Sequence, residues 1–149
     1  RKPAKYSRRK KRGGSHTFLG SRNQAWLENA LRLDYERTET GVVVYVMNSA
    51  AHSVPGAPLR ALQVGILITA ADGDVLHSDV KLYTHPLDAA GAVIEGKAGD
   101  DRLKAEETRA IDIALDGAKL GGAKLTVSAL YRRHDDDPWT QIASLNEGI

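Results

Sequence analysis

Residues 62–83 read LQVGILITAADGDVLHSDVKLY, and this stretch decides the fold that the sequence predicts. Apolar side chains recur at every second position from Leu62 to Ile68, which is the period of a strand with one buried face. The Asp72-Gly73 pair that follows suits a tight hairpin turn. A return strand is expected over Val75–Tyr83, with the side chains that face inward being Leu76, Val80 and Leu82. The stretch therefore predicts an antiparallel hairpin.

The same two-residue period recurs on both sides of the hairpin. Further strands are expected at Leu31–Glu36, Val42–Met47, Arg109–Leu115, Leu125–Tyr131 and within Trp139–Leu145. About seven short strands separated by turns are typical of an immunoglobulin-like β-sandwich, and a closed barrel is the competing fold. We therefore expect one all-β sandwich domain over residues 31–149.

The N-terminal part of the chain has a different composition. Residues 1–14 carry eight Lys or Arg and no acid, so the remaining 13 basic and 19 acidic residues give the body a charge of −6. We expect a flexible basic arm over residues 1–14, and over residues 15–30 a linker with a short helix at Arg22–Asn29. Such an arm suits nucleic-acid phosphates, an anionic membrane surface, a solvated linker or an acidic partner domain. The acidic body and the single aromatic of the arm, Tyr6, argue against nucleic acid.

Several classes of function are excluded by residues that the sequence lacks. The chain has no cysteine, so it holds no disulfide, thiolate metal site or covalently attached haem of its own. Its apolar runs are too short for a membrane span, and no nucleophile elbow, phosphate-binding loop or zinc-protease motif is present. We expect no enzyme activity from this chain on its own. It begins at Arg1, and we expect it to be a piece of a longer protein.

Two groups of histidine and carboxylate side chains have the composition of a metal site. His77 and Asp79 lie two apart on the return strand, with His85 nearby, and His134 precedes three aspartates. The first group also fits the solvent face of an amphipathic strand, and the second fits an acidic turn before Pro138. We favour these structural interpretations and predict no metal site.

Four short segments, taken in order, resemble a known family. These segments are Ser15-His-Thr-Phe-Leu-Gly20, Asn48-Ser-Ala-Ala-His-Ser-Val-Pro-Gly56, Ala105-Glu-Glu-Thr-Arg109 and Leu130-Tyr-Arg132. Together they resemble the C-terminal, non-haem β-domain region of a family of multihaem c-type cytochromes that are periplasmic or extracellular. The resemblance covers roughly residues 15–133.

The resemblance implies a role in electron transfer, as an accessory domain that packs on a haem-bearing upstream segment or subunit. It implicates His16 first and His52 second as distal ligands of haem c attached outside this chain. It assigns no role to His77, His85 or His134. The chain has Ala51 where the family pattern has glycine, and it lacks the threonine that precedes the last glycine of the turn. A structural role for His52 therefore stays open, as does the alternative that the domain is a binding or adhesion module with no redox role.

Overall fold

The computed structural model describes residues 28–56, 60–85, 87–90, 92 and 101–149. Within these residues, seven strands and one short 3-10 helix follow one another. They are β1 (Leu31–Thr38), β2 (Gly41–Asn48), β3 (Ala61–Thr69), β4 (Val75–Thr84), β5 (Thr108–Ala114), η1 (Gly117–Lys119), β6 (Lys124–Arg132) and β7 (Thr140–Gly148). All the expected strands are present. Of the expected helix at Arg22–Asn29, only residues 28 and 29 lie in the described part, and they are helical together with Ala30.

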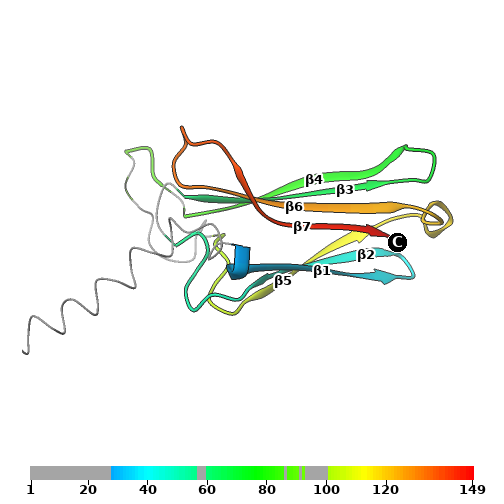
Figure 1. Cartoon of the computed structure of the whole chain (residues 1–149), viewed down its shortest axis with the longest axis horizontal. Helices are drawn as coiled ribbons and strands as arrows, with labels where there is room; N and C mark the ends of the chain where they lie inside the picture. The colour runs from blue at the N-terminus through cyan, green and yellow to red at the C-terminus, as the bar shows by residue number, and fades with distance from the viewer. Residues whose placement is uncertain (1–27, 57–59, 86, 91, 93–100) are drawn as a thin grey trace, which may run out of the picture.

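The strands form two antiparallel sheets that face each other (Figure 1). The three-stranded sheet has the order β1-β2-β5, and the four-stranded sheet has the order β4-β3-β6-β7. The predicted hairpin is the β3–β4 pair, and β1 lies against β7 on one side of the sandwich. The all-β, immunoglobulin-like sandwich of seven strands is thus confirmed, and the closed barrel is not formed.

The core lies between the sheets and is built from the alternating apolar positions of the strands. Its fully buried side chains include Val42, Val44, Val46, Leu62, Val64, Ile66, Ile68, Leu125 and Val127. Each is on the inward face because successive side chains of a strand point to opposite faces of the sheet. The inward face of β5, with Ile111, Ile113 and the following Leu115, packs on the same core as expected.

In strand β4 the alternate side chains that face the other sheet are not the ones that the sequence predicts. Val80 and Leu82 are 55% and 53% exposed, so the prediction that they face inward is wrong. The register places Tyr83, Lys81, Asp79 and His77 opposite the buried residues Leu62, Val64, Ile66 and Ile68 of β3. Leu76 does pack partly on the core, because a register shift at Ile68/Thr69 changes the alternation there.

The loops of the molecule are divided between two ends. The chain enters β1 at the end where the long β2–β3, β4–β5 and β6–β7 connections lie (Figure 1). The short β1–β2 and β3–β4 turns, η1 and the C-terminus lie at the opposite end. Three histidines far apart in the sequence, His52, His85 and His134, therefore come to the first end, which we call the loop end.

Candidate functional site

The loop end is organised around a buried asparagine at the end of β2. Asn48 is only 2% exposed, and its side-chain amide donates to the carbonyl oxygens of His52 at 2.8 Å, Leu103 at 3.2 Å and Lys104 at 2.8 Å. Its Oδ1 accepts from the Ala50 N–H at 2.9 Å. One side chain therefore fixes the loop that follows β2 to the segment that leads into β5.

Backbone bonds complete this anchorage. The Ser49 N–H donates to the Ala30 carbonyl at 2.8 Å, and the Asn48 N–H donates to the Glu107 carbonyl at 2.9 Å. Val54 and Leu103 form an isolated antiparallel bridge with bonds of 2.8 and 3.0 Å. The loop thus has fixed backbone positions on both sides of His52.

His52 presents an exposed imidazole on this anchored loop. Its Nδ1 lies 3.0 Å from the Ser53 carbonyl oxygen, which favours the tautomer with hydrogen on Nδ1 and the lone pair on Nε2. Histidines that ligate metals commonly donate the other ring N–H to a backbone carbonyl, because this bond fixes the tautomer and the orientation of the ring. The setting of His52 is therefore compatible with an iron ligand as well as with a structural histidine.

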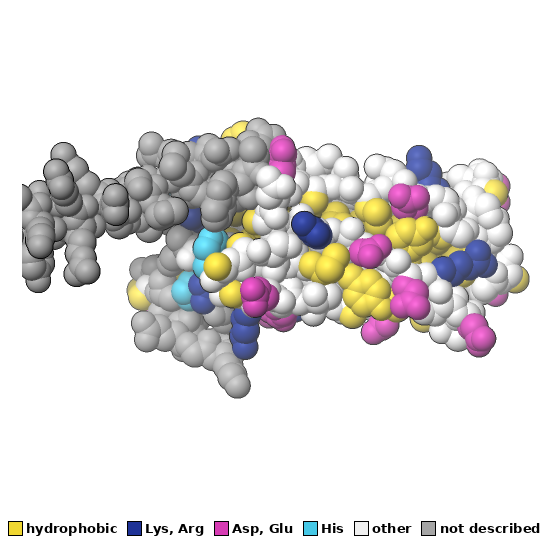
Figure 2. All heavy atoms as spheres, turned by 60° about the horizontal axis from the view of Figure 1, so that its bottom comes forward, with side chains coloured by type: hydrophobic (Ala, Val, Ile, Leu, Met, Phe, Trp, Pro, Cys, Tyr) yellow, Lys and Arg dark blue, Asp and Glu magenta, His cyan; other side chains and the backbone are white. Residues whose placement is uncertain are grey.

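The other predicted histidines have different settings. His16 lies outside the described residues, so its role as first candidate ligand stays a prediction. His134 is exposed, and its carbonyl accepts from the Asp137 N–H at 3.0 Å in the turn before Pro138. His77 Nε2 and His85 Nδ1 are buried atoms without a hydrogen-bond partner among the described residues. Histidine side chains are visible at the loop end in Figure 2.

No three histidine, aspartate or glutamate side chains of the described residues gather closely enough to hold a metal ion. His77 and Asp79 share a face of β4, but this is the face toward the other sheet, so their interpretation as a solvent face is wrong. Asp79 is paired with Lys81 at 2.9 Å. Because β4 is an edge strand, charged ends on this face still reach water.

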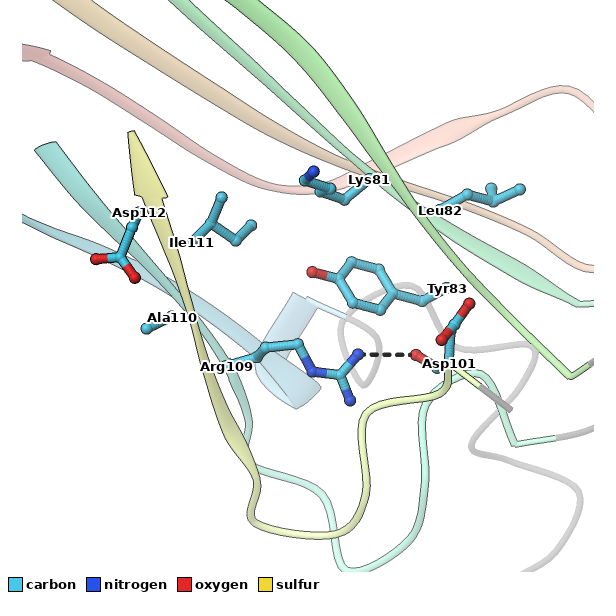
Figure 3. Close-up of a pocket in the computed structure, with 8 residues that line it drawn as sticks. All are labelled: Lys81, Leu82, Tyr83, Asp101, Arg109, Ala110, Ile111 and Asp112. Atoms are coloured by element: carbon cyan, nitrogen blue, oxygen red, sulfur yellow. Dashed lines mark hydrogen bonds between the residues drawn. The ribbon is translucent and has the colours of Figure 1, made fainter. Parts of the chain in front are cut away.

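A second polar site lies at the seam between the edge strands β4 and β5 (Figure 3). The Arg109 guanidinium stacks over the Tyr83 ring, 5.2 Å from its centroid. It donates to the carbonyl oxygens of Asp101 at 3.1 Å and Arg102 at 3.3 Å, and to Glu107 Oε1 at 2.9 and 3.2 Å. Arg109 therefore joins the two sheets and fixes the segment before β5.

Glu107 completes this arrangement with its second oxygen, which accepts from the Lys104 N–H at 2.6 Å. Burial acts to raise the pKa of Glu107, but the bonds from Lys104 and Arg109 and the charge of Arg109 hold it below its ordinary value. The segment Ala105–Arg109, which the sequence analysis used only for the family resemblance, thus has a structural role. Its side chains Glu107 and Arg109 hold the residues that precede β5 in place.

Glu107→Gln should therefore destabilise the domain in a pH-dependent way. A carboxylate with a lowered folded-state pKa stabilises the fold above its unfolded pKa of about 4.3, and this contribution is lost as the pH falls. Since the pair is partly exposed, we expect a loss of about 1 kcal/mol at pH 7. Urea unfolding at pH 7 and pH 3 should show the two proteins converging at the lower pH. Glu106→Gln is the control. An equal effect of both substitutions would contradict the structural role of Glu107.

Comparisons with known proteins give a likeness of fold. No family model and no curated protein matches the chain. A penta-haem cytochrome c552 from Thermochromatium tepidum superposes with a TM-score of 0.64 at 18% identity, over 85% of this chain and 41% of that one. Two β-glucuronidase structures from Bacteroides uniformis have TM-scores of 0.33 and 0.32 at 16% identity, over 78% and 80% of this chain and 12% and 13% of theirs. The chain thus shares its fold with less than half of the cytochrome.

Proposed function

We propose that this chain is the accessory β-domain of a multihaem c-type cytochrome, with a role in electron transfer and no reaction of its own. The observation that carries the proposal is the likeness in fold to part of a penta-haem cytochrome over most of this chain. The order of the four sequence segments supports the same family independently. Under this proposal the protein works in the periplasm or outside the cell, as multihaem c-type cytochromes of this kind do.

His16 and His52 are the side chains that we propose as distal ligands of haem attached outside this chain. A neutral imidazole is a suitable ligand for haem iron, and an anchored loop reduces the cost of holding it in one orientation. His52 supports this role through its exposure, its Ser53 contact and the bonds of Asn48 to its loop. The haem would supply the electron-transfer chemistry, and these residues would hold its iron.

The outer face of the four-stranded sheet supports a packing role for the domain. Leu67, Val80 and Leu82 are 38%, 55% and 53% exposed, and all three lie on the outward face of the β3–β4 pair. Gly65 is paired with Val80 and adds no side chain to this strip. Grouped apolar side chains on a surface commonly mark a contact with another protein surface. We propose that this strip packs on the haem-bearing segment or subunit.

In the described part of the chain no helix is long and apolar enough to cross a membrane.

The coding sequence around this domain gives the first test. We expect Cys-x-x-Cys-His sites upstream in the same reading frame or in a neighbouring gene. Their absence would contradict the electron-transfer proposal and favour a binding or adhesion module, which the same exposed strip would serve.

In the haem-containing protein, His52→Ala and His16→Ala should each convert one haem from low spin to high spin. The change should appear in the absorption and electron paramagnetic resonance spectra, because a lost axial ligand weakens the ligand field. His134→Ala, a histidine of the same end without a proposed role, should leave both spectra unchanged. An unchanged spectrum for either of the first two variants would exclude that residue as a ligand.

A further inference from the structure

The seam between β4 and β5 contains a cavity of about 450 Å³. Its walls are formed by consecutive residues of both strands, Lys81-Leu-Tyr83 on β4 and Arg109-Ala-Ile-Asp112 on β5, together with Asp101. Consecutive residues of a strand point to opposite faces, so side chains of one face alone cannot form these walls. The cavity is therefore bordered by the backbone edges of the two strands, as their placement in Figure 3 shows.

The edge of β5 that faces the cavity carries backbone groups that pair with no strand of the described residues. The Asn48 N–H donates to the Glu107 carbonyl and the Leu115 N–H donates to the Thr40 carbonyl, each at 2.9 Å, at the two ends of the β2–β5 pairing. In an antiparallel pair, hydrogen-bonded residues alternate, so these two bonds assign positions 107, 109, 111, 113 and 115 to the ladder with β2. Ala110 and Asp112 therefore direct their N–H and C=O groups to the open edge.

The side-chain hydroxyl of Tyr83 also faces the cavity. Tyr83 is only 3% exposed as a residue, and its hydroxyl points across the seam toward β5 (Figure 3). The seam thus offers hydrogen-bonding groups from a side chain and from the backbone.

The charges around the seam favour a basic occupant. Lys81 is paired with Asp79, and Arg109 is paired with Glu107, so both cations of the seam are neutralised. Among the described residues that line the cavity, the carboxylates that remain are those of Asp101 and Asp112. Asp112 is also in line with Glu36 across β2, on the outer face of the three-stranded sheet. Aspartate and glutamate side chains are spread over this side of the molecule in Figure 2.

We propose that the seam binds an extended basic segment as an additional strand beside β5, and that this segment is the chain's own arm at residues 1–14. Strand addition uses the open N–H and C=O groups for affinity and alternate side chains for specificity. The arm has eight Lys or Arg and no acid, which complements the two carboxylates of the seam. The proposal does not depend on haem or on the proposed electron-transfer role.

The connection between the arm and β1 is long enough for this placement. Residues 15–27 separate the arm from the helical residues 28–30 that lead into β1, and 13 extended residues span up to about 43 Å. A strand of eight residues is only about 26 Å long. The arm can therefore reach any part of the β5 edge from the start of β1.

The absence of cysteine allows a direct test on the full chain. A nitroxide attached at Ser7→Cys should broaden the amide signals of residues 81–83 and 109–112 in the ¹⁵N-labelled protein at low salt. Raising the salt to about 1 M should reduce the broadening, because it screens the charges. Absence of broadening at the seam, or equal broadening over the whole surface, would overturn the proposal.

Two substitutions separate strand addition from simple attraction between charges. Ala110→Pro removes one N–H from the open edge, a position where an edge strand tolerates proline, and should abolish the broadening while the core remains folded. Asp112→Asn should weaken it severalfold, whereas Asp136→Asn, the same change of charge in the β6–β7 loop, should not. Unchanged broadening in both Ala110→Pro and Asp112→Asn would overturn strand addition. Broadening seen only between a spin-labelled chain and a separate ¹⁵N-labelled chain would show that the arm binds a second copy instead.

Discussion

Replacing Gly41 by alanine should destabilise the domain by about 3–5 kcal/mol, the largest effect that we expect from one substitution. Gly41 has a φ of +155° and lies between Thr38 and Ala114 in the three-stranded sheet. A Cβ at this position would overlap the carbonyl oxygen of Ile113 and lie 2.9 Å from its carbonyl carbon. Since both neighbours are backbone atoms of an adjoining strand, relief requires β2 and β5 to move apart.

Thermal unfolding followed by circular dichroism would measure this effect, as a fall in Tm on the order of 10 °C or more. Gly73→Ala is the matched control. Gly73 also has a positive φ, +95°, but an added Cβ would meet nothing within 4 Å. The Gly73→Ala substitution should therefore lower the free energy of unfolding by about 1–2 kcal/mol, which is the strain of the backbone conformation alone. Equal losses in the two variants would show that the contact with Ile113 contributes nothing.

Asn48→Ala should have the second-largest effect, a loss of about 3 kcal/mol in the free energy of unfolding. The substitution leaves the Ala50 N–H and the carbonyl oxygens of His52, Leu103 and Lys104 without the partner that they have now. Buried groups that lose their partner cost about 1–3 kcal/mol each, although water entering the loop would recover part of this. Urea unfolding would measure the change.

The same substitution should also loosen the loop that carries His52. Hydrogen exchange of the Ala50 amide should become faster by more than the global loss of stability explains, because its acceptor is removed directly. Asn146→Ala, at an exposed position of β7, should change the stability by less than about 0.5 kcal/mol. If Asn48→Ala behaved like this control, the buried amide would not organise the loop end.

The fold was predictable because its strands carry the two-residue period in full. Four alternate apolar residues in β3 and four in β6 leave one possible inward face for each, and both are buried as predicted. The Asp72-Gly73 turn fixed which strands form the hairpin. Central strands are predictable in this way because both neighbours and the opposite sheet restrict them.

The phase of β4 was not predictable from the same pattern. As an edge strand beside the open seam, β4 can direct Asp79 and Lys81 toward the other sheet because their charged ends reach water there, and it can leave Val80 and Leu82 exposed. Alternation of apolar and polar residues gives the period of a strand, but it does not say which face is buried when neither face is fully covered.

The site was predictable only in part. The resemblance drew attention to His52, but the bonds that anchor its loop, from Asn48 and between Val54 and Leu103, were not predicted. The seam was missed because its parts, Tyr83, Asp101 and Arg109, come from separate segments with no common motif. The one available signal was Arg109 at a position that faces inward with Ile111 and Ile113, where an arginine needs partners that bond its guanidinium.

The placement of the chain ends has a mechanical consequence. β1 begins at the loop end, whereas the C-terminus lies at the opposite end of the sandwich (Figure 1). A nine-residue strand is about 30 Å long, so the domain acts as a rigid spacer of roughly that length between whatever is joined to its two sides. A force applied through these two points pulls along the strands, so the hydrogen bonds of a strand pair share the load instead of breaking one after another.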